Sequence, residues 1–267
     1  MDKYRVKADE KIRLKNYNPD DTNQFPDGKQ ASLARMAEMT QKLDKLQEVL
    51  YAEHKHKILV ILQARDAAGK DGTIRSVFSG VNPQGVHIQS FKTPTELEID
   101  HDYLWRIHAQ VPGKGELVVF NRSHYEDVLV VRVHNIVTKE EWSKRYDQIR
   151  NFEKLLADEG TTILKFYLNI SKDEQKQRLQ DRIDDPAKNW KFNPGDLKER
   201  ALWDEYTYAY EDAFNETSTA WAPWYIIPAN HNWYRNLCVA SILVKALEDL
   251  AMKYPAPTAD LSKIVIE

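Results

Sequence analysis

The chain has 267 residues, and its 38 Lys and Arg residues against 41 Asp and Glu give a formal net charge of −3. This balance excludes the bulk positive field of a general nucleic-acid binder, so an anionic ligand must be met by a local group of cations. The single cysteine, Cys238, excludes an intramolecular disulfide and a cysteine-based zinc site. The polar N-terminus is broken by Pro19 and Pro26 and lacks the apolar core of a signal peptide. We therefore expect a cytoplasmic protein.

Residues 1–56 are expected to form an N-terminal segment followed by one helix. The first thirty residues are charged and rich in turn formers. In the stretch that follows, an apolar residue recurs every three or four positions, at Met36, Met39, Leu43, Leu46 and Leu50. This spacing predicts a helix of about twenty residues from near Ser32, packed on the domain or on a partner subunit.

From residue 57 to residue 254 the pattern alternates between short apolar strands and amphipathic helices. Strands are predicted at 58–62, 86–91, 117–120, 162–170 and 224–228, and helices at about 70–80, 95–109, 123–131, 139–158, 172–184, 197–215 and 232–252. The first strand is apolar throughout, which is typical of a strand buried on both faces. We therefore predict an α/β fold with a mostly parallel sheet covered by helices on both sides, followed by a C-terminal tail at 255–267.

The loop after the first strand has the features of a phosphate-binding site. Such a loop needs small residues so that backbone N–H groups can converge on an anion, a helix N-terminus, and a lysine that reaches the outer phosphates. The residues that supply these features are Ala64, Ala67, Ala68, Gly69, Lys70 and Gly72.

The match to the Walker A pattern G-x-x-x-x-G-K-[ST] is imperfect. Ala64 replaces the first glycine, and Asp71 replaces the hydroxyl that normally holds magnesium. We predict a variant P-loop in which Asp66 or Asp71 takes over the metal. The alternative is an ordinary helix start, capped by Asp66, with Lys70 in solvent.

The third strand runs directly into a polar segment, 121–127, at the sheet edge where open α/β sheets bind ligands. Asn121 stands where P-loop enzymes usually carry a carboxylate near magnesium, and an amide can still accept a metal-bound water. Arg122, and Arg132 further along, offer planar forks that suit phosphate.

The acids of the same segment allow two interpretations. Ser123 and Glu126 fit a helix capping box, so the spacing leaves open whether Glu126 binds a ligand or caps a helix. Asp127 falls beside the expected phosphate site, which favours a functional role.

A cluster of cations follows at 172–196, on a helix that Ser171 is expected to cap and on the loop after it. Its members are Arg178, Arg182, Lys188 and Lys191. The arrangement is typical of a lid that closes over a polyanion. The alternative is that the two arginines pair with Asp181 and Asp185 on the same helix.

Four separated motifs in the same order resemble the polyphosphate kinase 2 family of P-loop phosphotransferases, and the likeness spans nearly the whole chain. They lie at 66–73, at 121–132, at 189–192 with 195–197, and at 221–225 with 228–229 and 233–235. Members of this family move phosphoryl groups between inorganic polyphosphate and nucleotides. Many carry Asp-Arg-Ser-x-Tyr-Asn-Arg at the third strand, where this chain has Asn-Arg-Ser-His-Tyr-Glu-Asp. In this respect the motif of this chain resembles that of the subgroup that phosphorylates both AMP and ADP.

The resemblance implies a role for each matched residue. Asp66 would hold magnesium, Lys70 would contact the transferring phosphates, and Arg122 and Asp127 would line the nucleotide side. From its position beside the expected phosphate site, we predict that Asp127 holds magnesium as well. Because a nucleotide phosphate has a second pKa of about 6, it is largely ionised at neutral pH, so Asp127 is expected to bind metal and orient rather than act as a base. The nucleotide- and phosphate-binding candidates are Ala67, Ala68, Gly69, Lys70, Asp71, Gly72, Asn121, Arg122, Glu126 and Arg132, and the lid candidates for polyphosphate are Arg178, Arg182, Lys188 and Lys191.

The resemblance also implies a three-layer α/β/α sandwich of the P-loop kinase type with a helical lid, and a homo-oligomer, commonly a tetramer. The expected cofactor is Mg²⁺ and the expected ligands are inorganic polyphosphate, AMP, ADP and ATP, with no nucleic acid or membrane partner. One alternative is a nucleoside monophosphate kinase that uses ATP as donor. Another is a binding module without catalysis, which the carboxylates of Asp66, Asp71 and Asp127 disfavour.

Overall fold

The computed structural model describes residues 1–8, 10–264 and 266. Within these ranges the centre is one sheet of five parallel strands, in the order β2-β3-β1-β4-β5. The strands are β1 (Lys57–Ala64), β2 (Val86–Ser90), β3 (Leu117–Asn121), β4 (Thr161–Asn169) and β5 (Trp224–Pro228). All five predicted strands are confirmed, and so is their parallel direction.

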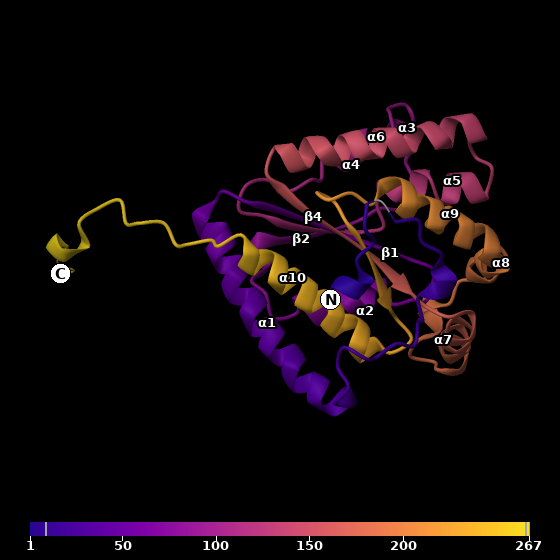
Figure 1. The fold of residues 1–267 in the computed structure, drawn as a ribbon, viewed down its shortest axis with the longest axis horizontal. Coiled ribbons are helices and arrows are strands. Elements are labelled where there is room, and N and C mark those ends of the chain that lie inside the picture. The colour runs from indigo at the N-terminus through magenta and orange to yellow at the C-terminus, as the bar shows by residue number, and fades with distance from the viewer. Residues whose placement is uncertain (9, 265, 267) are drawn as a thin grey trace.

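Helices cover both faces of the sheet, so the three-layer α/β/α arrangement is confirmed (Figure 1). One layer contains α1 (Gly28–Glu53), α2 (Lys70–Phe78) and α10 (Asn232–Asp249). The other contains α6 (Lys139–Asp158) and α9 (Trp203–Thr217). At the end of the sheet where the strands finish lie α7 (Lys172–Asp184) and α8 (Gly195–Ala201).

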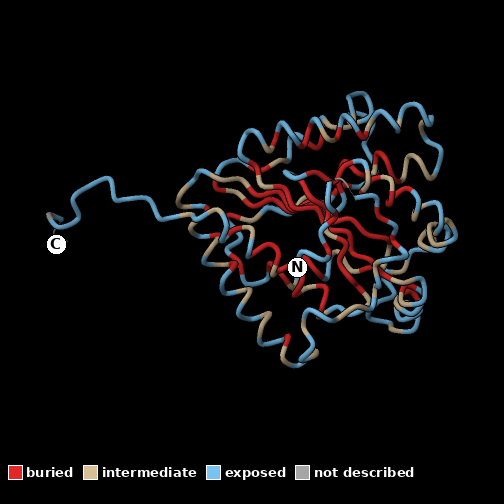
Figure 2. Tube along the Cα trace, viewed as in Figure 1, coloured by how far each residue is buried: buried red, intermediate tan, exposed pale blue. Residues whose placement is uncertain are grey.

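The burial of β1 on both faces explains the unbroken apolar run at 58–62 within it. Successive side chains of a strand point to opposite faces. Ile58, Val60 and Leu62 accordingly join the core beneath α1, α2 and α10, whereas Leu59 and Ile61 join the core beneath α6 and α9. Figure 2 shows the resulting band of buried residues along the strands in the middle of the molecule.

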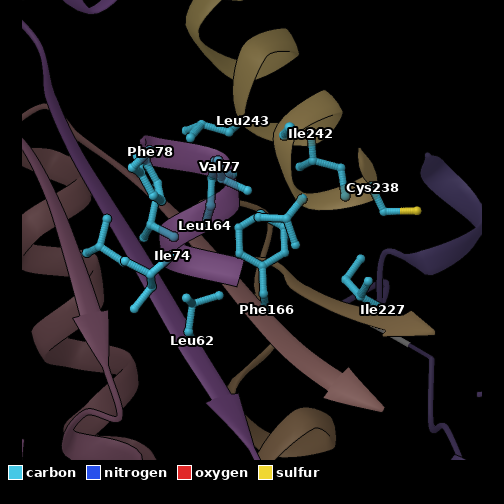
Figure 3. Close-up of a cluster of buried hydrophobic side chains, with 14 of the residues drawn as sticks. Leu62, Ile74, Val77, Phe78, Leu164, Phe166, Ile227, Cys238, Ile242 and Leu243 are labelled. Carbon is cyan, nitrogen blue, oxygen red and sulfur yellow. The ribbon is translucent and has the colours of Figure 1, made fainter. Parts of the chain in front are cut away.

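The first of these cores is built by segments from the whole length of the chain. Figure 3 shows side chains of α2 and α10 directed onto those of β1 and β4, among them Leu62, Val77, Leu164, Phe166 and Leu243. Cys238 on α10 lies in this core as a buried free thiol. The packing fixes the start of α2, and with it the loop that precedes α2, against the sheet.

Three predicted helices are each replaced by two shorter pieces. The prediction at 95–109 becomes α3 (Glu96–Ile99) and α4 (Trp105–His108), because Asp102 accepts a bond from the N–H of Leu104 that competes with helical pairing. The prediction at 123–131 becomes a 3₁₀ helix (His124–Asp127) and α5 (Val130–Val133). The prediction at 197–215 becomes α8 and α9, with a break at Leu202.

The remaining described segments are short or extended. Further 3₁₀ helices lie at Asp2–Tyr4, Leu14–Asn16, Pro83–Gly85, Asn189–Lys191 and Leu261–Lys263. After α10 the chain extends away from the body of the molecule (Figure 1). The predicted tail at 255–267 falls in this part of the chain, and its residues Val265 and Glu267 lie outside the described residues. None of the helices in the described ranges is both long enough and apolar enough to cross a bilayer.

Candidate functional site

The loop between β1 and α2 adopts a curled backbone that suits an anion. Ala67 and Gly69 both have left-handed backbone angles, with φ of 61° and 103°. Such residues curl the chain so that neighbouring N–H groups converge on one point. Gly69 stands at the N-cap position of α2, so the alternative in which Asp66 caps this helix is wrong.

Lys70 folds back over this loop. Its Nζ donates to the carbonyl oxygen of Ala64, 3.0 Å away, which keeps the ammonium beside the loop. Burial lowers the pKa of Lys70, and the nearby guanidinium of Arg122 lowers it further.

The end of β3 lies beside the loop because Asn121 pairs in register with Leu62 of β1. Nδ2 of Asn121 donates to Oδ1 of Asp71 over 2.7 Å. Two of the positions at which this chain departs from the usual P-loop pattern, Asn121 and Asp71, are therefore hydrogen-bonded to each other.

Arg122 follows in a left-handed backbone conformation, with φ of 64°. Its Nη2 lies 3.4 Å from Oδ1 of Asp66. Burial alone would lower the pKa of Arg122, but the carboxylates of Glu126 and Asp66 together raise it above the usual value. Arg122 is thus a charged guanidinium held at the mouth of the loop.

Glu126 does not complete the capping box that its spacing allows. The Ser123 hydroxyl accepts from the N–H of Tyr125 instead of that of Glu126. The Glu126 carboxylate lies beside the amide of Gln63. In the orientation in which the amide oxygen accepts from Ser123, the amide nitrogen donates to Oε1 of Glu126 over 3.0 Å. Burial raises the pKa of Glu126, against the opposing charges of Arg122 and Lys70.

Two hollows meet at this point of the molecule. The larger, of about 830 Å³, lies over the loop and α7, and its lining includes Lys70, Asp71, Asn121, Arg178, Arg182, Lys188, Lys191 and Arg235. The smaller, of about 360 Å³, has a lining that includes Arg65, Glu126, Arg200, Trp203, Tyr206 and Tyr210. The residues that line both hollows are Asp66, Arg122, Asn193 and Asp196.

The arginines of α7 do not pair with Asp181 or Asp185, so that alternative is wrong. Nε of Arg178 bonds to Glu174, and its other nitrogens donate to backbone carbonyls of the loop and of the segment after β5. Nη1 of Arg182 donates to Oδ2 of Asp196 over 3.0 Å.

Three candidates from the sequence line neither hollow: Ala68, Asp127 and Arg132. Asp127 is buried with its carboxylate 3.1 Å from Nη1 of Arg145. Burial raises its pKa to about 6, against the opposing charges of Arg145 and Arg106. Arg132 donates to Asp212 and lies over the ring of Trp142.

Three other arginines at the site were not among the candidates: Arg65, Arg200 and Arg235. The guanidinium of Arg65 lies 3.8 Å from the ring centre of Trp203, in the smaller hollow. Arg235, in the first turn of α10, donates to the carbonyl of Ala68 under the loop. The signal for Arg65 is a cation directly after the end of β1, three residues past the apolar run 58–62. The signal for Arg235 is a cation on the otherwise apolar face of a helix.

Comparisons with known proteins agree with this geometry. The family model described as Polyphosphate kinase 2 (PPK2) matches residues 27–255. The chain is 64% identical over 267 residues to the AMP/ADP-polyphosphate phosphotransferase of Meiothermus ruber, covering 100% of both chains. It is 43% identical to the ADP-polyphosphate phosphotransferase of Rhodopseudomonas palustris, covering 99% of this chain and 95% of the relative. The crystal structure of polyphosphate kinase 2 from Arthrobacter aurescens TC1 superposes with a TM-score of 0.94 at 45% identity, covering 97% of this chain and 92% of that one.

Proposed function

Because this chain belongs to the polyphosphate kinase 2 family, we propose that it transfers phosphoryl groups from inorganic polyphosphate to AMP and to ADP, forming ADP and ATP. Such an enzyme must bring a polyanionic donor and a nucleotide acceptor together. The observation that carries the proposal is the pair of hollows that share Asp66 and Arg122 beside the phosphate-binding loop.

The larger hollow suits the donor. Polyphosphate carries negative charge along its whole length, so its site needs cations spread over a long surface rather than at one point. The lining of this hollow includes Lys70 together with the cations of α7 and of the loop after it. We assign polyphosphate to this hollow.

The smaller hollow suits the acceptor. Aromatic side chains offer flat faces on which a nucleobase stacks, and a stacked arginine adds a further flat surface. Trp203, Tyr206 and Tyr210 supply such rings, and Arg65 stacks on the first of them. A nucleotide bound here would direct its phosphates towards Asp66 and Arg122, where the hollows meet.

We propose Asp66 as a ligand of the Mg²⁺ cofactor, with Asp71 beside it. Mg²⁺ prefers oxygen ligands and is held in such enzymes by one or two carboxylates together with waters and substrate phosphates. The carboxylates of Asp66 and Asp71 both border the larger hollow next to Lys70, so the donor set fits. The described residues contain no group of three or more His, Cys, Asp or Glu arranged for a metal, and a site completed by phosphates needs none. We propose no metal role for Asp127, because its buried carboxylate lines neither hollow.

The protein's part in the reaction is positioning and charge stabilisation. Charge on a transferring phosphoryl group spreads over its equatorial oxygens, and bound Mg²⁺ would neutralise part of it. The ammonium of Lys70 and the guanidinium of Arg122 would stabilise the remainder from two sides. The attacking oxygen belongs to a nucleotide phosphate that is largely ionised at neutral pH, so no side chain has to remove a proton.

The test is to incubate the purified protein with Mg²⁺, polyphosphate and either AMP or ADP, without ATP, and to follow the nucleotides by chromatography. ATP formed from AMP by way of ADP supports the proposal, and Lys70→Ala is expected to abolish it. Lys55→Ala, an exposed lysine just before β1, is the matched control and is expected to leave the rate unchanged. Product from ADP alone would limit the acceptors to ADP. Product only after ATP is added as donor would contradict the proposal and favour an ATP-dependent nucleoside monophosphate kinase.

The homotetramer, the cytoplasmic location and the lack of nucleic-acid or membrane partners stay predictions. Sedimentation velocity measures the first directly. A monomer at micromolar concentration would contradict it.

A further inference from the structure

Three successive carbonyl groups of the phosphate-binding loop are bonded by side chains from α7 and α10. Gln175 donates to the carbonyl of Asp66 over 3.0 Å. Arg178 donates to the carbonyls of Ala67, over 3.2 Å, and Ala68, over 3.1 Å. Arg235 donates to the carbonyl of Ala68 over 2.9 Å. A peptide unit is planar and trans, so a carbonyl and the next residue's N–H point in opposite directions. Holding these carbonyls against the helices therefore turns the N–H groups of Ala67 and Gly69 the other way.

Arg235 also fills the space next to Gly69. A side-chain carbon added to Gly69 would overlap with Nη1 of Arg235. The left-handed φ of 103° at Gly69 independently disfavours any other residue. The loop can therefore approach α10 this closely only because Gly69 has no side chain.

The guanidinium of Arg235 is held by neutral oxygens. Besides the carbonyl of Ala68, it donates to Oδ1 of Asn232 at 2.7 Å and to Oδ1 of Asn236 at 2.9 and 3.1 Å. The side chain is only 2% exposed, and no carboxylate of the described residues forms an ion pair with it. Burying a cation without an anionic partner costs free energy, so this side chain is not explained by its contribution to stability.

We propose that Arg235 is a positioning residue that holds the loop in its phosphate-binding conformation before polyphosphate arrives. The inference rests on the proposed function, because it takes polyphosphate as the anion that the loop binds. Without the guanidinium of Arg235, the binding of polyphosphate must also order the loop. The free energy spent on this ordering lowers the apparent affinity for polyphosphate. At saturating polyphosphate the loop is ordered again, so the KM for polyphosphate rises much more than kcat falls.

The test compares Arg235→Gln and Arg235→Lys with the wild type, measuring the Kd of inorganic polyphosphate by calorimetry together with KM and kcat. Both variants are expected to raise Kd and KM about tenfold or more, with kcat within about threefold of the wild type. Lysine keeps the charge but has a single nitrogen in place of the planar fork, so it cannot reproduce the bonds that Nε, Nη1 and Nη2 make to Ala68, Asn232 and Asn236. Arg150→Gln, on α6 far from the loop, is the control that should change none of the three constants.

Several results would overturn the inference. Wild-type affinity in Arg235→Lys would mean that the charge matters and the fork does not. A fall in kcat at unchanged KM, or wild-type constants in Arg235→Gln, would also contradict it. If wild-type protein fails to bind polyphosphate at all, the proposed function fails as well, whereas binding that Lys70→Ala removes and Arg235→Gln leaves intact overturns only the role of Arg235.

A second comparison pairs Arg235 with Gly69, and Arg235→Lys, which keeps the buried charge, remains the test of the fork if Arg235→Gln does not fold. Gly69→Ala alone is expected to weaken polyphosphate binding, because its new side chain meets Arg235 and the backbone is strained. Since both residues act on the same loop, the variant Gly69→Ala/Arg235→Ala should lose less affinity than the product of the two single losses. Losses that simply multiply would contradict a shared role.

Discussion

Nδ2 of Asn121, at the end of β3, donates a 2.7 Å hydrogen bond to Oδ1 of Asp71 at the start of α2. P-loop enzymes usually have a carboxylate on the strand and a hydroxyl in the loop. Here the carboxylate stands in the loop, and an amide on the strand faces it. An amide can donate and an ionised carboxylate can only accept, so the two residues complement each other as a pair.

We predict that Asn121→Asp lowers kcat/KM about tenfold or more, because it sets two carboxylates at hydrogen-bond distance and one must take a proton or move away. The variant Asn121→Asp/Asp71→Asn restores an amide opposite a carboxylate and is expected to recover part of the loss. Steady-state kinetics of Asn121→Asp, Asp71→Asn and the double variant measures these changes in kcat/KM. Asn151→Asp, on the exposed side of α6, is the control. If the loss of kcat/KM in the double variant equals the product of the losses in the two single variants, the residues act independently.

The buried ion pair of Lys165 and Glu153 gives a prediction about stability. Nζ of Lys165 lies 2.6 Å from Oε2 of Glu153, and both side chains are fully buried. Burial alone would raise the pKa of Glu153, but the ammonium of Lys165 holds this pKa below its usual value. Lys165→Met leaves this carboxylate buried without its partner and is expected to lower the free energy of unfolding by about 3–5 kcal/mol.

The double variant Lys165→Met/Glu153→Leu removes both charges and is expected to regain most of that loss. Urea unfolding followed by circular dichroism measures both changes. Lys245→Met breaks the exposed pair with Asp249 and should cost far less than breaking the buried pair, because exposed ion pairs add little to stability. Equal costs for the buried and the exposed pair would refute this account.

The raised pKa of Asp127 predicts a pH dependence of stability. Its folded-state pKa of about 6 lies above its ordinary value of 3.8, so between these values the folded protein binds a proton that the unfolded chain has released. The contribution of Asp127 to stability is therefore fully present below about pH 4 and is lost as the pH rises through about 6.

Asp127→Asn removes this titration. The stability of the wild type relative to Asp127→Asn should fall by on the order of 2 kcal/mol between pH 4.5 and pH 7.5, as measured by urea unfolding at about those pH values. A relative stability that rises with pH would mean that the attraction of Arg145 outweighs burial.

The exposed lysines beside the larger hollow predict a dependence on salt. Lys188→Ala/Lys191→Ala is expected to raise the KM for polyphosphate about three- to tenfold at low ionic strength. The difference from the wild type should shrink near 1 M salt, where charges are screened within about 3 Å. Lys144→Ala/Lys154→Ala removes the same charge from α6 and should leave the KM unchanged. A difference that persists at high salt would show that these lysines act by more than their charge.

The sequence by itself determined the α/β architecture and the place of the phosphate-binding loop. Both depend on patterns that are local in the chain: the apolar run of β1 requires cover on both faces, and the small residues around Lys70 are contiguous with it. The helix breaks at Asp102 and Leu202 escaped this reasoning, because one side-chain bond or one residue interrupts a periodicity that otherwise continues.

Only the tertiary structure decided which polar side chains meet. Asn121 and Asp71 are fifty residues apart, and Arg235 lies beside Ala68 only because the strand order and the packing of α10 bring them together. Glu126 and Asp127 are neighbours, yet one borders a hollow and the other pairs with Arg145. In a 3₁₀ helix three residues complete a turn, so adjacent side chains point in different directions, and which of them faces the site is settled by what packs around the helix.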